Sequence, residues 1–145
     1  MLRAILSTAF ALVLISSPAA ENKSTMSTRS HAAENRVFEL RTYHLNDGKL
    51  DDLHKRFRDH TCGLLKTHGA ELIGFWTPLD DKDGKGAKLV YLVAFPSREA
   101  AKKTWEDFGK DPEWIKVREE SHANGVLVKK VDSVFLEPTD YSETK

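Results

Sequence analysis

Cysteine is almost absent from this chain, because Cys62 is the only one among its 145 residues. A single thiol excludes an intrachain disulfide framework and a cysteine-rich zinc or iron–sulfur site. A surplus of one charge is absent too, since 22 Lys and Arg balance 22 Asp and Glu. Nucleic-acid-binding domains usually carry a basic surplus, so we expect no nucleic-acid partner.

The common catalytic and metal-binding motifs are also missing. The sequence holds no glycine-rich phosphate loop, no serine-nucleophile motif and no HxxxH or HExxH pair. The acidic loop near residue 82 does not fit a calcium loop, because Leu79 and Val90 would occupy two of the acidic ligand positions. We therefore expect no metal site and no required cofactor, with haem as the one alternative considered below.

The first twenty residues differ from the rest of the chain. Arg3 precedes an apolar run over residues 4–15, and small residues fill positions 16–20. This order is typical of a secretory signal peptide, and the run is shorter than the roughly 20 residues that cross a bilayer. We expect cleavage after Ala19 or Ala20, export to the periplasm or the extracellular space, and no stable membrane anchor. Residues 21–35 are polar and aperiodic, which predicts a flexible leader.

Residues 36–142 are predicted to form one α+β domain. Residues 37–44 alternate between apolar and polar, and the apolar-rich segments 70–77, 88–95 and 126–136 are strand-like, which predicts four strands. Three- and four-residue spacing predicts a helix over 49–68, and Ser97 and Asp111 are suitable N-caps for two more. The order βαββαβ is that of the ferredoxin-like sandwich, a four-stranded antiparallel sheet with helices on one face.

The two central strands of the sequence are apolar on both faces. In the second strand Leu72 and Trp76 alternate with Ile73 and Phe75, and every residue of 89–95 is apolar or aromatic. Helices cover one face only, so the other would expose a larger apolar patch than soluble monomers usually tolerate. We therefore expect a homodimer in which two sheets pack face to face.

Several segments occur in an order that is typical of one family. They are VFELRTY at 37–43, RFRDHT at 56–61, GFW at 74–76, LVYL at 89–92, DPEW at 111–114 and SVFLEPTDYS at 133–142. Over residues 36–142 the chain resembles the NIPSNAP family. The resemblance implies a dimeric α/β-barrel, a fold shared with cofactor-independent monooxygenases, haem-degrading enzymes and stress-response proteins, and it implies no particular reaction. Members of that family are tied to mitochondrial roles. Because this chain is predicted to be exported, we do not expect it to have the mitochondrial partners of that family.

The first predicted strand carries the main candidate site. Glu39, Arg41 and Tyr43 share one face, opposite Phe38 and Leu40. If the apolar face packs against the helices, the charged face looks into the barrel. A buried arginine then needs a carboxylate, water or an anionic ligand, because leaving it unpaired costs several kcal/mol. Either these residues form a ligand pocket, or an Arg–Glu pair only fixes the register of the dimer or faces solvent.

Three further residues complete the candidate set. His60 and His68 lie about 12 Å apart along one helix, too far to chelate one ion, but His60 alone would suit a haem ligand or a general base. The alternative is that His60 has only a structural role, at the boundary between the core and the surface. Trp76 and Tyr91 would line an aromatic cavity or belong to the core, whereas Trp105 and Trp114 are assigned to packing.

Three functions are therefore open at the level of the sequence. The first is a homodimeric module whose cavity binds a small apolar or mildly acidic molecule. The second is an enzyme of the monooxygenase or haem-handling kind, and the third is a non-catalytic interaction protein.

Overall fold

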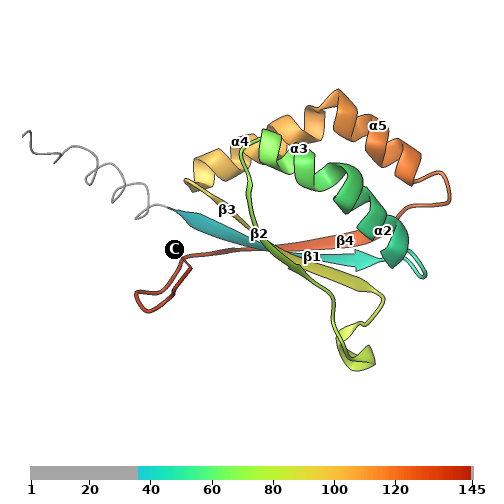
Figure 1. The fold of residues 1–145 in the computed structure, drawn as a ribbon, viewed down its shortest axis with the longest axis horizontal. Helices are drawn as coiled ribbons and strands as arrows, with labels where there is room; N and C mark the ends of the chain where they lie inside the picture. Colours follow the sequence, from blue (N-terminus) through green and yellow to red (C-terminus); the bar gives the residue numbers. More distant parts are fainter. Residues whose placement is uncertain (1–35, 145) are drawn as a thin grey trace, which may run out of the picture.

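The computed structural model describes residues 36–144 (Figure 1). The predicted signal peptide, 1–20, and leader, 21–35, lie outside the described residues. The elements are β1 (Val37–Leu45), α2 (Leu50–Arg56), a π-helical turn η1 (Phe57–Thr61), α3 (Cys62–Thr67), β2 (Glu71–Trp76), a short 3-10 turn η2 (Asp81–Asp83), β3 (Lys88–Phe95), α4 (Arg98–Lys110), α5 (Pro112–Ser121) and β4 (Val128–Leu136).

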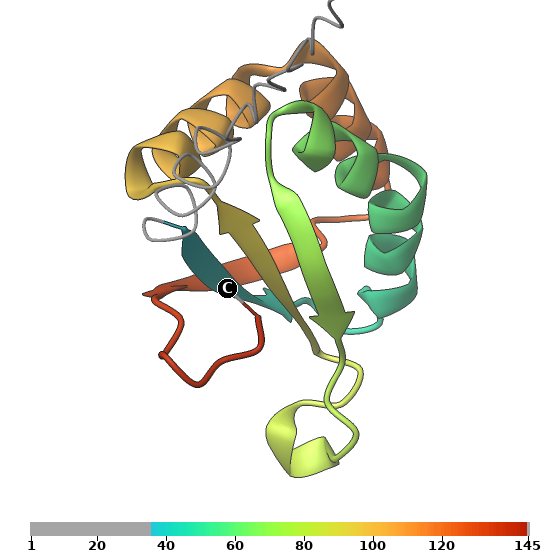
Figure 2. The ribbon, with the colours of Figure 1, turned by 60° about the vertical axis from the view of Figure 1, so that its left-hand side comes forward.

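The four strands form one antiparallel sheet in the order β2-β3-β1-β4. The helices lie together over one face of it, and within residues 36–144 the other face carries no helix (Figures 1 and 2). This is the ferredoxin-like α+β arrangement that the sequence predicts. The observed strands differ from the predicted ones by at most two residues at either end.

Two helices begin at the capping residues that the sequence predicts. The Ser97 hydroxyl accepts a hydrogen bond from the backbone N–H of Ala100 at 3.1 Å. The Asp111 carboxylate accepts one from the N–H of Glu113 at 2.8 Å, with Pro112 at the first position of α5. Such oxygens satisfy amides that no helical carbonyl can reach, so α4 and α5 start where these residues stand.

The core lies between the sheet and the helices, and it fixes which way each strand faces. On β3 the buried side chains Leu89, Tyr91, Val93 and Phe95 pack in this core. Arg41 pairs with Tyr91 across β1 and β3, and partners in an antiparallel pair point to the same face. The face of β1 that bears the charged residues therefore packs beneath the helices.

This result corrects the orientation considered for β1. The condition that the face of Phe38 and Leu40 meets the helices is not met, so Glu39, Arg41 and Tyr43 do not look into a barrel between two sheets. The physical reason is the register with β3, whose bulkier face includes Tyr91 and fills the space under the helices.

The opposite side of the sheet, which we call the open face, is largely apolar. Trp76 and Val134 are each 53% exposed there, and Leu136 is 41% exposed. Leu40 and Leu92 are direct cross-strand partners on the same face, and both are half-buried. The expectation of an uncovered apolar sheet face is confirmed for the described protomer.

Gly74 allows Trp76 to lie flat along β2 on the open face. The ladder between β2 and β3 shifts register between Leu72 and Gly74. A Cβ atom at Gly74 would stand 2.6 Å from the ring of Trp76. Because no side chain is present there, the indole covers the strand backbone instead of projecting away from it.

The described segment, 36–144, includes no helix that is both long and apolar enough to cross a membrane.

The contact between His68 and Asp111 predicts a specific loss of stability in acid. Nε2 of His68 lies 2.7 Å from Oδ2 of Asp111, which joins the end of α3 to the start of α5. The hydrogen bond from His68, followed by the backbone bond from Glu113, holds the pKa of Asp111 below its ordinary value. A lowered folded-state pKa gives stability that is present above the unfolded-state pKa and is lost as the pH falls through the folded one.

We expect Asp111→Asn to reduce that acid sensitivity. Asparagine caps the helix about as well as aspartate but does not titrate. Between about pH 5 and pH 2, the free energy of unfolding should therefore fall more steeply in the natural protein than in the variant. Urea denaturation at several pH values measures both slopes, and equal slopes would show that the Asp111 carboxylate contributes nothing.

Candidate functional site

The candidate site is built around the carboxylate of Glu39, which is 1% exposed. Nη1 of Arg41 donates to Oε1 at 2.8 Å, and the hydroxyl of Ser133 donates to the same oxygen at 2.5 Å. The indole Nε1 of Trp105 donates to Oε2 at 2.5 Å. One buried charge thus receives donors from β1, β4 and α4.

Local geometry explains why these three donors meet. Glu39 and Arg41 are two residues apart on a strand, so their side chains leave the same face. Ser133 is the cross-strand partner of Arg41 in the β1–β4 ladder. Trp105 lies on α4 above them, and the Arg41 guanidinium stands 4.1 Å from the centroid of its ring. The indole therefore donates through its edge and accepts a cation on its face.

The electrostatic balance keeps Arg41 charged. Burial is the largest influence on this guanidinium and disfavours the charge. Tyr91, Tyr43 and Glu39 together outweigh the burial, and the net effect raises the pKa of Arg41 above its ordinary value. Its Nε atom is nevertheless buried and has no hydrogen-bond partner in the described structure.

Two tyrosines form the inner wall of the site. The hydroxyl of Tyr91 donates to the hydroxyl of Tyr43 at 3.1 Å, and the two rings meet edge to face at 5.3 Å. Tyr91 is completely buried, and this burial raises its pKa well above the ordinary value. The Tyr91 phenol therefore stays neutral at physiological pH.

A groove, here called the α4 groove, opens above the Glu39 carboxylate. Its volume is about 740 Å³, within the roughly 300–1,000 Å³ range of small-molecule sites. The lining combines buried and apolar surface with charged side chains from α4. The residues are Glu39, Trp105 and Phe135, with Arg98, Glu99, Lys102 and Glu106. The Arg98 guanidinium stands 3.8 Å from the Phe135 ring centroid, so cation and ring form one wall.

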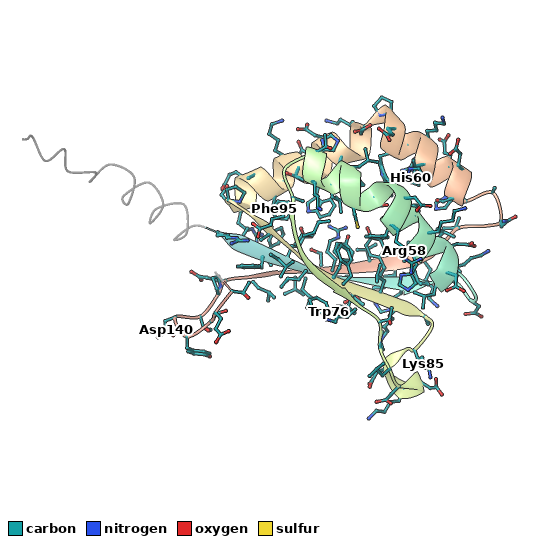
Figure 3. All side chains as sticks on the ribbon, viewed as in Figure 1. Arg58, His60, Trp76, Lys85, Phe95 and Asp140 are labelled. Atoms are coloured by element: carbon teal, nitrogen blue, oxygen red, sulfur yellow. The ribbon has the colours of Figure 1, made fainter. Side chains whose placement is uncertain are left out.

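The structure brings four of the six predicted site residues together. Glu39, Arg41, Tyr43 and Tyr91 lie side by side between the sheet and the helices. Trp76 lies on the other side of the sheet, on the open face (Figure 3). It therefore cannot share one cavity with Tyr91.

His60 is placed away from this cluster, on the exposed side of the helical layer (Figure 3). In the π-helical turn the buried side is taken by Phe57 and Thr61, which are four residues apart. The Thr61 hydroxyl donates to the carbonyl of Arg56 at 3.2 Å, and Thr61 takes the buried position instead of His60. His60 lines a second groove in which charged side chains predominate, and that lining does not fit the apolar faces of haem.

Sequence reasoning missed two contributors to the site. Trp105 was assigned to packing, and its spacing on α4 gives no sign of a carboxylate partner. Ser133 becomes a donor to Glu39 only through the register of β4 against β1, which the sequence does not state. Among residues 36–144, no three histidine, cysteine or acidic side chains lie close enough to hold a metal ion.

Comparison with solved structures places this fold among known ones. A NIPSNAP domain protein from Burkholderia xenovorans is 24% identical with a TM-score of 0.61, and the match covers 73% of this chain and 97% of that one. A NIPSNAP family protein of unknown function from Agrobacterium tumefaciens is 22% identical with a TM-score of 0.65, covering 76% and 94%. SnoaB, a cofactor-independent oxygenase from Streptomyces nogalater, is 8% identical with a TM-score of 0.51, covering 77% and 99%.

At these identities the likeness to solved structures shows the fold alone. A search of curated proteins found no match. The family model named NIPSNAP, however, matches residues 38–143, which is nearly the whole described domain. That match agrees with the resemblance carried by the sequence segments, and it shows that the chain belongs to the NIPSNAP family.

Proposed function

We propose that this protein is an exported homodimer that binds a small organic molecule in the α4 groove of each protomer. The observation that carries the proposal is the fixed floor of that groove, where Glu39 holds Trp105 and Arg41 beneath a space of ligand size. Export rests on the signal-peptide pattern of residues 1–20, which lie outside the described structure.

The chemistry of the groove favours a flat molecule that carries one acidic group. Nε1 of Trp105 is committed to Glu39, so the rest of the indole supplies apolar contact area together with Phe135. Arg98 and Lys102 stand beside these rings and attract a carboxylate. Lys102 is only loosely engaged by Glu106, at 3.9 Å, in a pair that water screens.

The open face supports association with a second copy of the chain. Trp76, Val134 and Leu136 lie exposed on a side of the sheet that no helix of the described segment covers. Sheets that pack face to face stand about 10 Å apart and exclude water from such side chains. A second copy of the chain supplies the same apolar face, so a symmetric dimer buries the exposed apolar side chains of both copies.

In this arrangement the ligand site differs from the barrel cavity that the sequence suggests. The space between two sheets receives apolar side chains such as Leu40 and Leu92. The charged residues of β1 belong instead to the helix side of each protomer, beneath the α4 groove. The proposed dimer therefore has two separate grooves, one in each copy.

The dimer predicts a clear contrast between two exposed valines. Val134 is 53% exposed on the open face, whereas Val126 is 52% exposed just before β4. Val134→Glu should place a charge in the interface and give single copies, while Val126→Glu should leave the dimer intact. Light scattering coupled to size-exclusion chromatography measures both at micromolar concentration. A natural protein that runs as a single copy would refute the dimer.

The ligand chemistry predicts binding of a flat aromatic acid. We expect 1-naphthoate to bind and neutral 1-naphthamide to bind more weakly, as measured by isothermal titration calorimetry. Arg98→Ala should weaken 1-naphthoate binding about five- to tenfold, the range of one charge-assisted contact. Lys116→Ala, on the exposed side of α5, is the matched control and should change nothing. Equal affinity for acid and amide, or no effect of Arg98→Ala, would contradict the proposal.

The floor of the groove predicts a large effect on stability. Glu39→Gln leaves Arg41 without its buried counter-charge and places an amide group against the donors that now meet a carboxylate. We expect a loss of about 3 kcal/mol in the free energy of unfolding, since removing one partner of a buried pair costs several kcal/mol. Glu106→Gln, in an exposed pair, should cost less than about 0.5 kcal/mol. Urea denaturation compares them, and similar midpoints would contradict the central role of Glu39.

A further inference from the structure

A second groove lies on the helical side of the domain, away from Glu39. It is bounded by α2 and the π-helical turn η1 on one side and by α5 on the other, and we call it the α2–α5 groove. Its volume is about 260 Å³, which is slightly below the usual range for drug-sized ligands and suits a small metabolite. The proposed function uses none of its residues.

Arg56 lies at the base of this groove and is only 5% exposed. Its Nη1 donates to the hydroxyl of Ser121 at 3.2 Å, and its guanidinium stands 5.1 Å from the centroid of the Trp114 ring. Its Nε atom is buried without a partner. Within residues 36–144, no carboxylate lies within ion-pair distance of it.

The electrostatic surroundings leave this cation uncompensated. Burial is the main cause that lowers the pKa of Arg56, and the nearby charge of Arg118 lowers it further. Only the phenols of Tyr43 and Tyr91 act in the opposite direction. Arg41, which approaches the same two phenols, has Glu39 as a counter-charge. A buried guanidinium without an anion is costly, so the base of the groove favours a negatively charged group from outside.

The rim of the groove has the opposite character. Asp52, Asp59 and Glu120 contribute three negative charges, against Lys55 and the buried Arg56. The acidic, lysine and arginine side chains of the lining sum to one net negative charge, two positive minus three negative. A simple anion would be attracted by Arg56 at the base but repelled by the acidic rim. A simple cation would be attracted by the rim but repelled by Arg56. A molecule with both charges satisfies both ends.

We propose that the α2–α5 groove binds a small zwitterion, an α- or ω-amino acid. Its carboxylate lies on the guanidinium of Arg56 beside the hydroxyl of Ser121. Its ammonium group lies at the rim, which Asp59 of η1 and Glu120 of α5 both line. Asp59 has no ion pair of its own among residues 36–144, so it is available for an ammonium group. Asp52 and Glu120 are loosely paired with Lys49 at 3.8 Å and Lys116 at 3.9 Å.

The first experiment compares the binding of zwitterions with the binding of simple anions and a simple cation to the full-length natural protein. Calorimetry and thermal melting are followed with glycine, γ-aminobutyrate and 5-aminovalerate, and then with butyrate, butylammonium and inorganic phosphate. We expect one of the amino acids to bind at least tenfold more tightly than butyrate, butylammonium or phosphate. Butyrate or phosphate binding as tightly as the best amino acid would overturn the zwitterion, and no binding up to 10 mM would overturn the site.

The second experiment separates a ligand-binding arginine from a structural one. Arg56→Met replaces an unpaired buried cation by an apolar side chain of similar length. A ligand-binding role predicts that amino-acid binding is lost while the melting temperature of the free protein stays equal or rises. Arg58→Met, at a neighbouring exposed position, is the matched control and should bind normally. A free variant that melts well below the natural protein would mark Arg56 as structural and overturn the proposal.

A third variant tests the rim without disturbing the core. Asp59 is exposed, so Asp59→Asn should fold like the natural protein. It should weaken binding of the amino acid about five- to tenfold and leave butyrate binding unchanged or stronger. Asp81→Asn, on the distant turn η2, serves as the matched control. Unchanged binding of the amino acid by Asp59→Asn would refute the placement of the ammonium group. The outcome is independent of 1-naphthoate binding in the α4 groove, so the two proposals fail separately.

Discussion

The buried carboxylate of Glu39 determines how the inner strand β1 and the edge strand β4 meet the helix α4. A charge that is 1% exposed is tolerated only when its oxygens are satisfied, and its donors come from three different elements. Without Trp105, Oε2 of Glu39 would lose the hydrogen-bond donor that satisfies it. The helix α4 is therefore tied to β1 and β4 through hydrogen bonds as well as apolar packing, and the floor of the α4 groove is fixed before any ligand arrives.

The half-buried Arg41 and the buried Arg56 show two ways in which the same domain accommodates a cation. Arg41 and Arg56 both approach the phenols of Tyr43 and Tyr91. Arg41 has a carboxylate neighbour on its own strand, so its charge is balanced within the sheet. Arg56 reaches the core from a helix and meets only hydroxyl groups and rings. The domain thus contains one internally neutral pair and one cation whose balance must come from elsewhere.

The fold could be predicted from the sequence because its signals are local. The alternation of strands, the cap at Ser97 and the Asp111–Pro112 start of α5 each act within a few residues. The facing of β1 could not be predicted, because β3 is apolar on both faces and only the packing around Tyr91 decides between them. The burial of Thr61 in place of its neighbour His60 could not be predicted either, because the spacing of the apolar residues around them allows both positions.

The two faces of the sheet are coupled through β4, an edge strand that pairs with β1 alone. Ser133 points to Glu39 on the helix side, while its neighbour Val134 lies on the open face. An edge strand with exposed side chains has few contacts of its own and opens more readily than a central strand. Covering Val134 with a second copy would hold β4 in place, and it would thereby keep the Ser133 hydroxyl on the Glu39 carboxylate. In the proposed dimer, association on one face of the sheet therefore stabilises the floor of the α4 groove on the other.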